Sequence, residues 1–165
     1  MESALLDNPI YLKHRDWMNR AIALAQAAGD AGEIPVGAVI VDAQGNAIAQ
    51  TANRKERDRD PTAHAELLAI RQAAQTLQDW HLNQCTLYVT LEPCPMCAGA
   101  IIHARLKLLV YGADDPKTGA IRSVLNLPDS PASNHRLQVL SGINESACQD
   151  QLQAWFQQKR KNSAE

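Results

Sequence analysis

Two groups of potential metal ligands, each at the start of an expected helix, constrain the fold of this chain most strongly. His64 lies in the first turn of an expected helix at residues 61–77, and Cys94 and Cys97 lie at the start of another at 95–105. If these helices follow neighbouring strands, their N-termini meet at the same edge of one sheet. Three side chains that can bind a metal ion then converge there.

The other expected elements complete an α/β pattern. Asp60 is expected to cap the helix at 61–77, with Pro61 in its first position. A hairpin followed by strands that alternate with helices predicts a sheet, partly antiparallel and partly parallel, with helices on both faces. The 165 residues suit a single domain, 1–165. The remaining expected elements are a helix at 15–31, strands at 36–41, 47–52, 86–90, 107–111 and 136–140, and a basic C-terminal helix at about 144–161.

The composition indicates a folded, soluble chain. Hydrophobic residues make up 45% of it and charged residues 21%, which supports a buried core. No apolar run reaches the roughly 18 residues of a membrane span, and the N-terminus lacks the pattern of a secretory signal. We therefore expect a cytoplasmic protein in which the four cysteines, Cys85, Cys94, Cys97 and Cys148, are reduced.

The net charge of −2 differs from the strongly basic balance typical of nucleic-acid-binding proteins. Contact with RNA or DNA would depend on local patches. The candidates are residues 54–59, where acidic side chains dilute the basic ones, and the C-terminal Lys159, Arg160 and Lys161. The alternative interpretation is that both segments are solvated surface.

Cys94 and Cys97 are spaced so that their sulfurs share one side of a helix, whose N-terminus favours thiolates. Two converging thiolates suit zinc. The alternatives are a zinc ribbon, which needs a second Cys-x-x-Cys pair that the chain lacks, a redox pair, and buried cysteines without a role. His64 favours a zinc site, and the fourth position stays open because Cys85 and Cys148 lie in other elements. An open position is typical of catalytic zinc.

Glu66 follows His64 by two residues, about 200° around a regular helix. It is therefore expected to lie beside the water that zinc activates, not to bind zinc itself. A carboxylate there can accept the proton of that water and deliver it elsewhere. The alternative interpretation is that Glu66 only stabilises the first helical turn through the helix dipole.

His64-Ala65-Glu66, together with Pro93-Cys94-Pro95-Met96-Cys97, resembles the signature of zinc-dependent nucleobase and nucleoside deaminases. Residues 17–161 are most similar to the bacterial tRNA-specific adenosine deaminases of the cytidine deaminase-like superfamily. The resemblance implies a three-layer α/β/α fold with a mixed sheet of about five strands, a homodimer and one Zn²⁺ per subunit. The lack of a long apolar run predicts no membrane association. It also implies hydrolysis of the wobble adenosine of a tRNA anticodon to inosine, with release of ammonia.

The resemblance assigns roles to individual residues. His64, Cys94 and Cys97 bind zinc, and Glu66 is the proton shuttle. The implied contacts to the substrate base are Asn53 at the base edge and the backbone of Ala65. Asp115 would lie near a flanking ribose, where a 2′-hydroxyl distinguishes RNA, and Lys117 belongs to the same loop. Possible contacts to the RNA backbone are Lys159, Arg160 and Lys161. Alternatively, Asn53 is a turn residue, and Asp115 and Lys117 belong to a solvated loop.

Two other functions stay open from the sequence. Pro95, between the two cysteines, also occurs in guanine and cytidylate deaminases, so a free base or nucleotide is the alternative substrate. A noncatalytic zinc-binding partner subunit is a third hypothesis. Glu66 argues against it, because a structural zinc site has no use for that acid.

Overall fold

The computed structural model of this chain describes residues 6–164. Its strands form one sheet in the order β2-β1-β3-β4-β5. β1 pairs antiparallel with β2 and β3, whereas the pairs β3–β4 and β4–β5 are parallel. The predicted mixed sheet is confirmed. The elements are α2 (Pro9–Asp30), β1 (Gly37–Val41), β2 (Ala47–Ala52), α3 (Lys55–Asp58), α4 (Ala65–Leu77), β3 (Thr86–Leu91), α5 (Pro95–His103), β4 (Leu108–Ala113), β5 (Gln138–Ser141) and α6 (Glu145–Ser163).

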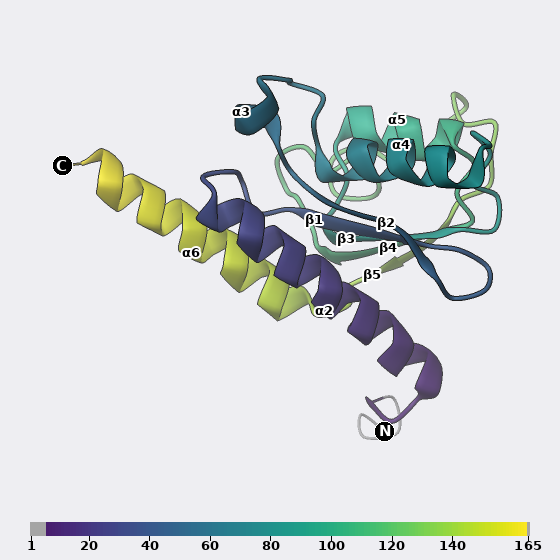
Figure 1. Cartoon of the computed structure of the whole chain (residues 1–165), viewed down its shortest axis with the longest axis horizontal. Helices are drawn as coiled ribbons and strands as arrows, with labels where there is room; N and C mark the ends of the chain where they lie inside the picture. Colours follow the sequence, from purple (N-terminus) through teal and green to yellow (C-terminus); the bar gives the residue numbers. More distant parts are fainter. Residues whose placement is uncertain (1–5, 165) are drawn as a thin grey trace.

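Helices cover both faces of the sheet, which gives the three layers visible in Figure 1. α2 and α6 pack on one face, and α4 and α5 on the other. Successive side chains of β1 alternate between the two cores: Ala38 and Ile40 belong to the core beneath α4 and α5, and Val39 and Val41 to the core beneath α2. Burial on both faces explains the continuous apolar runs of the central strands.

The start of α4 differs from the prediction. The helix begins at Ala65, not at Pro61, and His64 is its N-cap. Asp60 does not cap it: the Asp60 carboxylate accepts hydrogen bonds from the backbone N–H (2.8 Å) and the hydroxyl (2.7 Å) of Thr62. These bonds close a turn, and proline suits a turn as well as a first helical position.

Two other boundaries also differ from expectation. α2 begins at Pro9, well before residue 15, because the side chain of Asn8 caps it by accepting a hydrogen bond from the N–H of Ile10. The single-turn helix α3 was not predicted from its charged sequence. The buried carboxylate of Glu33 accepts hydrogen bonds from two N–H groups of this turn.

Within residues 6–164, no helix combines the length and apolarity needed to cross a membrane.

α2 crosses β1 at a position where only glycine fits. A Cβ atom on Gly37 would overlap the carbonyl oxygen of Ala21 and lie 2.8 Å from the backbone nitrogen of Ala25. Both atoms belong to the helix backbone, so they cannot move aside without displacing α2. The small residue therefore sets how closely this helix covers the sheet.

We predict that Gly37→Ala lowers the free energy of unfolding by about 1–3 kcal/mol, the usual cost of forcing extra atoms into a packed core. Gly99→Ala is the matched control, because no atom lies within 4 Å of its Cβ position, and alanine favours a helix. Denaturant titration should show a loss of stability for Gly37→Ala alone. Equal midpoints for the two variants would contradict the close packing.

Candidate metal centre and active site

His64 and Cys94 occupy equivalent positions at one edge of the sheet. β2 and β3 both run antiparallel to β1, so their carboxyl ends lie at the same edge. α4 follows β2 after the single-turn helix α3, and α5 follows β3 directly. His64 is the N-cap of α4 and Cys94 the N-cap of α5, each with an extended backbone, and Pro95 opens α5. The fold thus delivers both side chains to one place.

The structure brings the three predicted ligand side chains together. His64 Nδ1 lies 3.6 Å from Cys94 Sγ and 3.4 Å from Cys97 Sγ, and the three atoms all lie within 4.8 Å of one another. Bonds of about 2.3 Å to sulfur and about 2.0 Å to nitrogen in a tetrahedral zinc site place nitrogen and sulfur about 3.5 Å apart. The observed distances fit this geometry, so the group could hold a metal ion.

Hydrogen bonding makes Cys94 the more acidic of the two cysteines. The thiol of Cys97 donates to Cys94 and lowers its pKa to about 4; burial opposes this shift, and His64 adds to it. The same hydrogen bond, together with burial, raises the pKa of Cys97. The bond to Cys94 also raises the pKa of His64. Cys94 is therefore a ready anionic ligand, and metal binding would release the proton of Cys97.

Glu66 lies beside the ligand group with only 4% of its surface exposed. Burial raises its pKa, while hydrogen bonds from its own backbone N–H and from Cys97 act in the opposite direction. Because His64 is an extended N-cap, the separation expected on a regular helix does not apply, and Glu66 and His64 line the same pocket. A buried carboxyl group with a raised pKa can take up and release a proton.

The pocket beside these side chains has a volume of about 170 Å³. Of the predicted substrate contacts, Asn53, Ala65 and Asp115 line it, whereas Lys117 does not. The turn role considered for Asn53 is present: its side chain donates to the carbonyl of Ile34 (3.2 Å) and accepts from the N–H of Lys55 (3.2 Å). The amide of Asn53 is therefore fixed in the pocket wall. Lys55, from the candidate basic segment 54–59, also lines the pocket, and the lining residues that the sequence analysis did not assign are Ile34, Val36, Leu91, Glu92 and Thr118.

Glu92 is the buried acid that the sequence analysis missed. It is 2% exposed and follows β3, two residues before Cys94. Burial alone would raise its pKa, but hydrogen bonds from Arg122 and Ser123 lower it. The sequence clue was an acid directly after a buried strand, at the carboxyl edge where binding sites of α/β sheets form.

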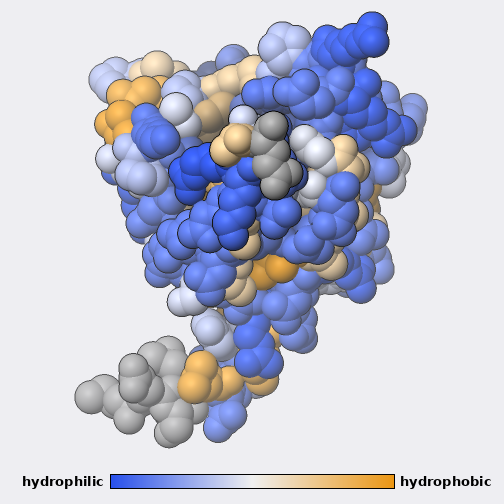
Figure 2. All heavy atoms as spheres, turned by 90° about the vertical axis from the view of Figure 1, so that its left-hand side faces the viewer, coloured by the Kyte–Doolittle hydropathy of each residue, from blue (hydrophilic) through white to orange (hydrophobic). Residues whose placement is uncertain are grey.

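The C-terminal basic residues lie outside the pocket. The ammonium of Lys159 lies 4.7 Å from the centre of the Trp155 ring. With Phe156, these two side chains border a groove that also reaches Asn53 and Lys55. The face that presents α3 and the end of α6 is predominantly hydrophilic (Figure 2). A polar partner can therefore approach the pocket from this side.

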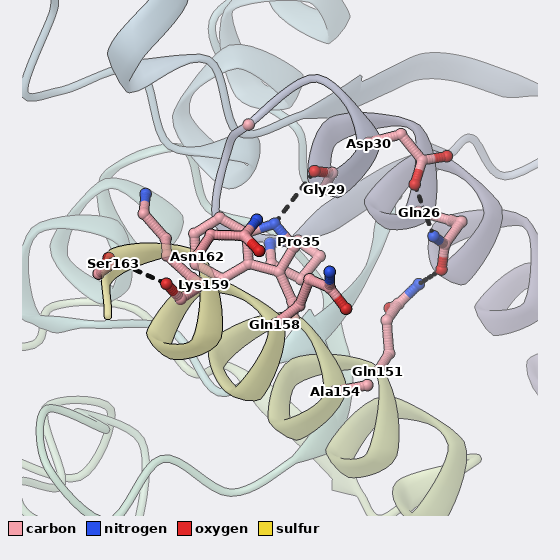
Figure 3. Close-up of a pocket in the computed structure, with 12 residues that line it drawn as sticks. Gln26, Gly29, Asp30, Pro35, Gln151, Ala154, Gln158, Lys159, Asn162 and Ser163 are labelled. Atoms are coloured by element: carbon pink, nitrogen blue, oxygen red, sulfur yellow. Dashed lines mark hydrogen bonds between the residues drawn. The ribbon is translucent and has the colours of Figure 1, made fainter. Parts of the chain in front are cut away.

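A larger hollow of about 680 Å³ lies between the C-terminal end of α2 and α6 (Figure 3). It is lined mainly by amides, such as Gln26, Gln151, Gln158 and Asn162, and by Trp155. No predicted metal ligand lines it, so the smaller pocket holds the reactive side chains.

Comparisons with known proteins agree with this site. Residues 12–160 match the MafB19-like deaminase family. The chain is 50% identical over 143 residues to the tRNA-specific adenosine deaminase of Haemophilus influenzae, covering 87% of this chain and 83% of the relative. A solved structure from work on A-to-I editing by tRNA:A34 deaminases at the wobble position has a TM-score of 0.80 and 43% identity, covering 82% of this chain and 98% of the other. The guanine deaminase of Bacillus subtilis has a TM-score of 0.60 and 39% identity, covering 76% of this chain and 82% of the other.

We predict that His64→Ala retains much less metal than the unaltered protein, because it removes one of three converging ligands. Metal analysis of the purified variant, after dialysis against a weak chelator, measures this. Cys85→Ala is the matched control, because Cys85 is a buried cysteine outside the ligand group, and it should keep its metal. Full retention by His64→Ala would refute the ligand assignment.

Proposed function

Since the chain belongs to the MafB19-like deaminase family and to the tRNA-specific adenosine deaminases, we propose that it hydrolyses adenosine to inosine at the wobble position of a tRNA anticodon and releases ammonia. The observation that carries the proposal is the convergence of His64, Cys94 and Cys97 at a pocket that His64, Cys94 and the buried Glu66 line. We place this reaction in a homodimer, as the resemblance of the sequence implies, and in the cytoplasm, where bacterial tRNA-modifying enzymes typically act.

We assign one zinc ion per subunit to His64, Cys94 and Cys97. One imidazole and two thiolates are typical zinc ligands, and three protein ligands leave the fourth position open. When bound, zinc supplies Lewis acidity that makes water a nucleophile near neutral pH. The lowered pKa of Cys94, which favours its thiolate form, supports this assignment.

Glu66 moves the protons of the reaction. Its carboxylate takes a proton from the water molecule that attacks C6 of adenine, and delivers this proton to N1. It then transfers the second proton of that water to the departing amine, which leaves as ammonia while C6 becomes a carbonyl. The net change is adenosine plus water to inosine plus ammonia. The burial of Glu66 suits a group that must change protonation state twice.

The remaining pocket residues recognise the substrate. A volume of about 170 Å³ is below the roughly 300 Å³ of pockets for drug-sized ligands, which suits one extruded base. We propose that Asn53 and the backbone of Ala65 contact this base, and that Asp115 lies near a neighbouring ribose. Lys117, although exposed, lies in the same loop as Asp115 and can face the nucleic acid.

We predict that Glu66→Gln keeps its metal and loses turnover. The amide has nearly the same shape but cannot accept a proton, and general acid–base roles are worth roughly 10²–10⁴-fold. Single-turnover formation of inosine in an anticodon stem-loop RNA measures the loss. A fall of less than tenfold would exclude the proton-transfer role.

The same assay decides between substrates. The similarity to a guanine deaminase makes free guanine the sharpest competitor, and cytidylate is tested beside it. The proposal expects inosine in the RNA and little ammonia from the free compounds. Rapid turnover of guanine with no inosine in the RNA would replace tRNA with a free base as the substrate.

We predict that replacing Lys159, Arg160 and Lys161 together with glutamine weakens RNA binding and flattens its salt dependence. Each lost phosphate contact lowers the slope of log affinity against log salt by about 0.7 for single strands, so the slope should fall by up to about 2. The matched control replaces Lys13, Lys107 and Arg136, which are exposed and lie outside the pocket. Equal slopes for both variants would place the RNA elsewhere.

A further inference from the structure

We propose that Glu92 is a positioning residue for substrate recognition, whose buried carboxylate holds the loop at residues 114–123 so that Asp115 stays at the rim of the pocket. The inference rests on the proposed function and deepens it. It concerns neither the metal ligands nor the proton carrier. Glu92 is the buried acid of the pocket to which the proposed mechanism gives no role.

The carboxylate of Glu92 binds both ends of this loop. Oε1 accepts a hydrogen bond from the N–H of Asp115 (3.1 Å) and another from the hydroxyl of Ser123. Oε2 accepts from the N–H groups of Ile121 (3.1 Å), Arg122 (2.9 Å) and Ser123 (3.0 Å). Among residues 6–164, no cation forms a salt bridge with Glu92. Backbone dipoles of the loop therefore replace water and counterion around this charge.

The loop also packs tightly against Glu92. A Cβ atom on Gly119 would overlap the Glu92 carboxyl carbon and lie 2.5 Å from the carbonyl oxygen of Asp115. Backbone bonds fix the neighbouring residues, from Glu92 N–H to the carbonyl of Ala113 (2.8 Å) and from Ala120 N–H to the carbonyl of Pro93 (2.9 Å). The segment that leads to the first metal cysteine is thus joined to the loop along its length.

Asp115 depends on this attachment for its position. Its own carboxylate accepts hydrogen bonds from the N–H groups of Lys117 (2.9 Å) and Thr118 (3.2 Å) and from the Thr118 hydroxyl (2.8 Å). These bonds shape the turn but do not fix it to the rest of the protein. The bond from Asp115 N–H to Glu92 does so, and Glu92, Asp115 and Thr118 all line the pocket.

Glu92→Gln tests this role with a minimal change. The amide oxygen can replace Oε2 and keep the three N–H donors of residues 121–123, while the hydroxyl of Ser123 can turn to accept from the amide nitrogen. The N–H of Asp115 then faces another donor and loses its partner. The substitution therefore acts mainly on Asp115. Ser123→Ala, which removes one hydroxyl donor, is a milder variant if Glu92→Gln folds poorly.

The kinetic experiment is a double-mutant cycle on the zinc-loaded protein with an anticodon stem-loop RNA, combining Glu92→Gln and Asp115→Ala. We expect Glu92→Gln to raise KM by about tenfold, the equivalent of one lost hydrogen bond to a charged group, and to change kcat by much less. Because both changes act through Asp115, the double variant should resemble Asp115→Ala alone. Effects that multiply, or a loss confined to kcat, would overturn the inference.

The matched control for the cycle is Glu33→Gln. Glu33 is also a buried carboxylate that accepts two backbone hydrogen bonds, from Glu56 (3.1 Å) and Arg57 (2.7 Å), but it holds a different segment. Whatever its own effect on KM, that effect should multiply with that of Asp115→Ala. If both substitutions act only by a general loss of stability, the coupling to Asp115→Ala would be the same in the two cycles. That result would count against a specific role for Glu92.

Amide hydrogen exchange separates this inference from the proposed function. We expect exchange at residues 115–123 to be about tenfold faster in Glu92→Gln, with α4 and α5 unchanged. If the unaltered protein forms no inosine in RNA, the proposed function fails, and the exchange rates still show whether Glu92 holds the loop. Unchanged exchange in the variant would overturn the inference even where the deaminase is active.

Discussion

The antiparallel pairing of β1 with both of its neighbours is the constraint on which the site depends. It makes β2 and β3 run in the same direction, so the two segments that follow them leave the sheet at one edge. His64 and Cys94 meet there, with His64 Nδ1 3.6 Å from Cys94 Sγ. A fold in which either strand ran the other way would place them at opposite edges of the sheet. The apolar pattern of the strands therefore determines, at a distance, whether a metal group can assemble.

The edge is crowded with acidic side chains that have few cationic partners. Glu33, Glu92 and Asp60 each accept hydrogen bonds from backbone N–H groups of a neighbouring turn. For the buried Glu33 and Glu92, such bonds compensate the charge without a cationic partner. The loops around the site are consequently shaped by carboxylates that accept hydrogen bonds from backbone N–H groups.

How far the sequence predicted this structure differs from residue to residue. The α/β architecture followed from apolar runs and helix periods, and the meeting of His64 with Cys94 and Cys97 followed from residue types that bind metals at two helix starts. The start of α4 was wrong because Asp60 and Pro61 suit a turn and a helix equally. The contacts of Glu92 were out of reach, because they depend on which amides of a loop, some thirty residues later, fold over it. Lys117, expected as a substrate contact, is exposed in the loop of Asp115 and does not line the pocket, and its role stays a prediction.

The two ligand-bearing caps have a thermodynamic consequence. His64 and Cys94 are the N-cap residues of α4 and α5, and they lie on chain segments that are about thirty residues apart. An ion shared between them would close that stretch of chain into a loop and link the two helices across their starts. Its binding energy would then be part of the folding equilibrium. Depletion of metal would therefore act as a denaturing condition at this edge of the sheet, as well as an inhibitory one.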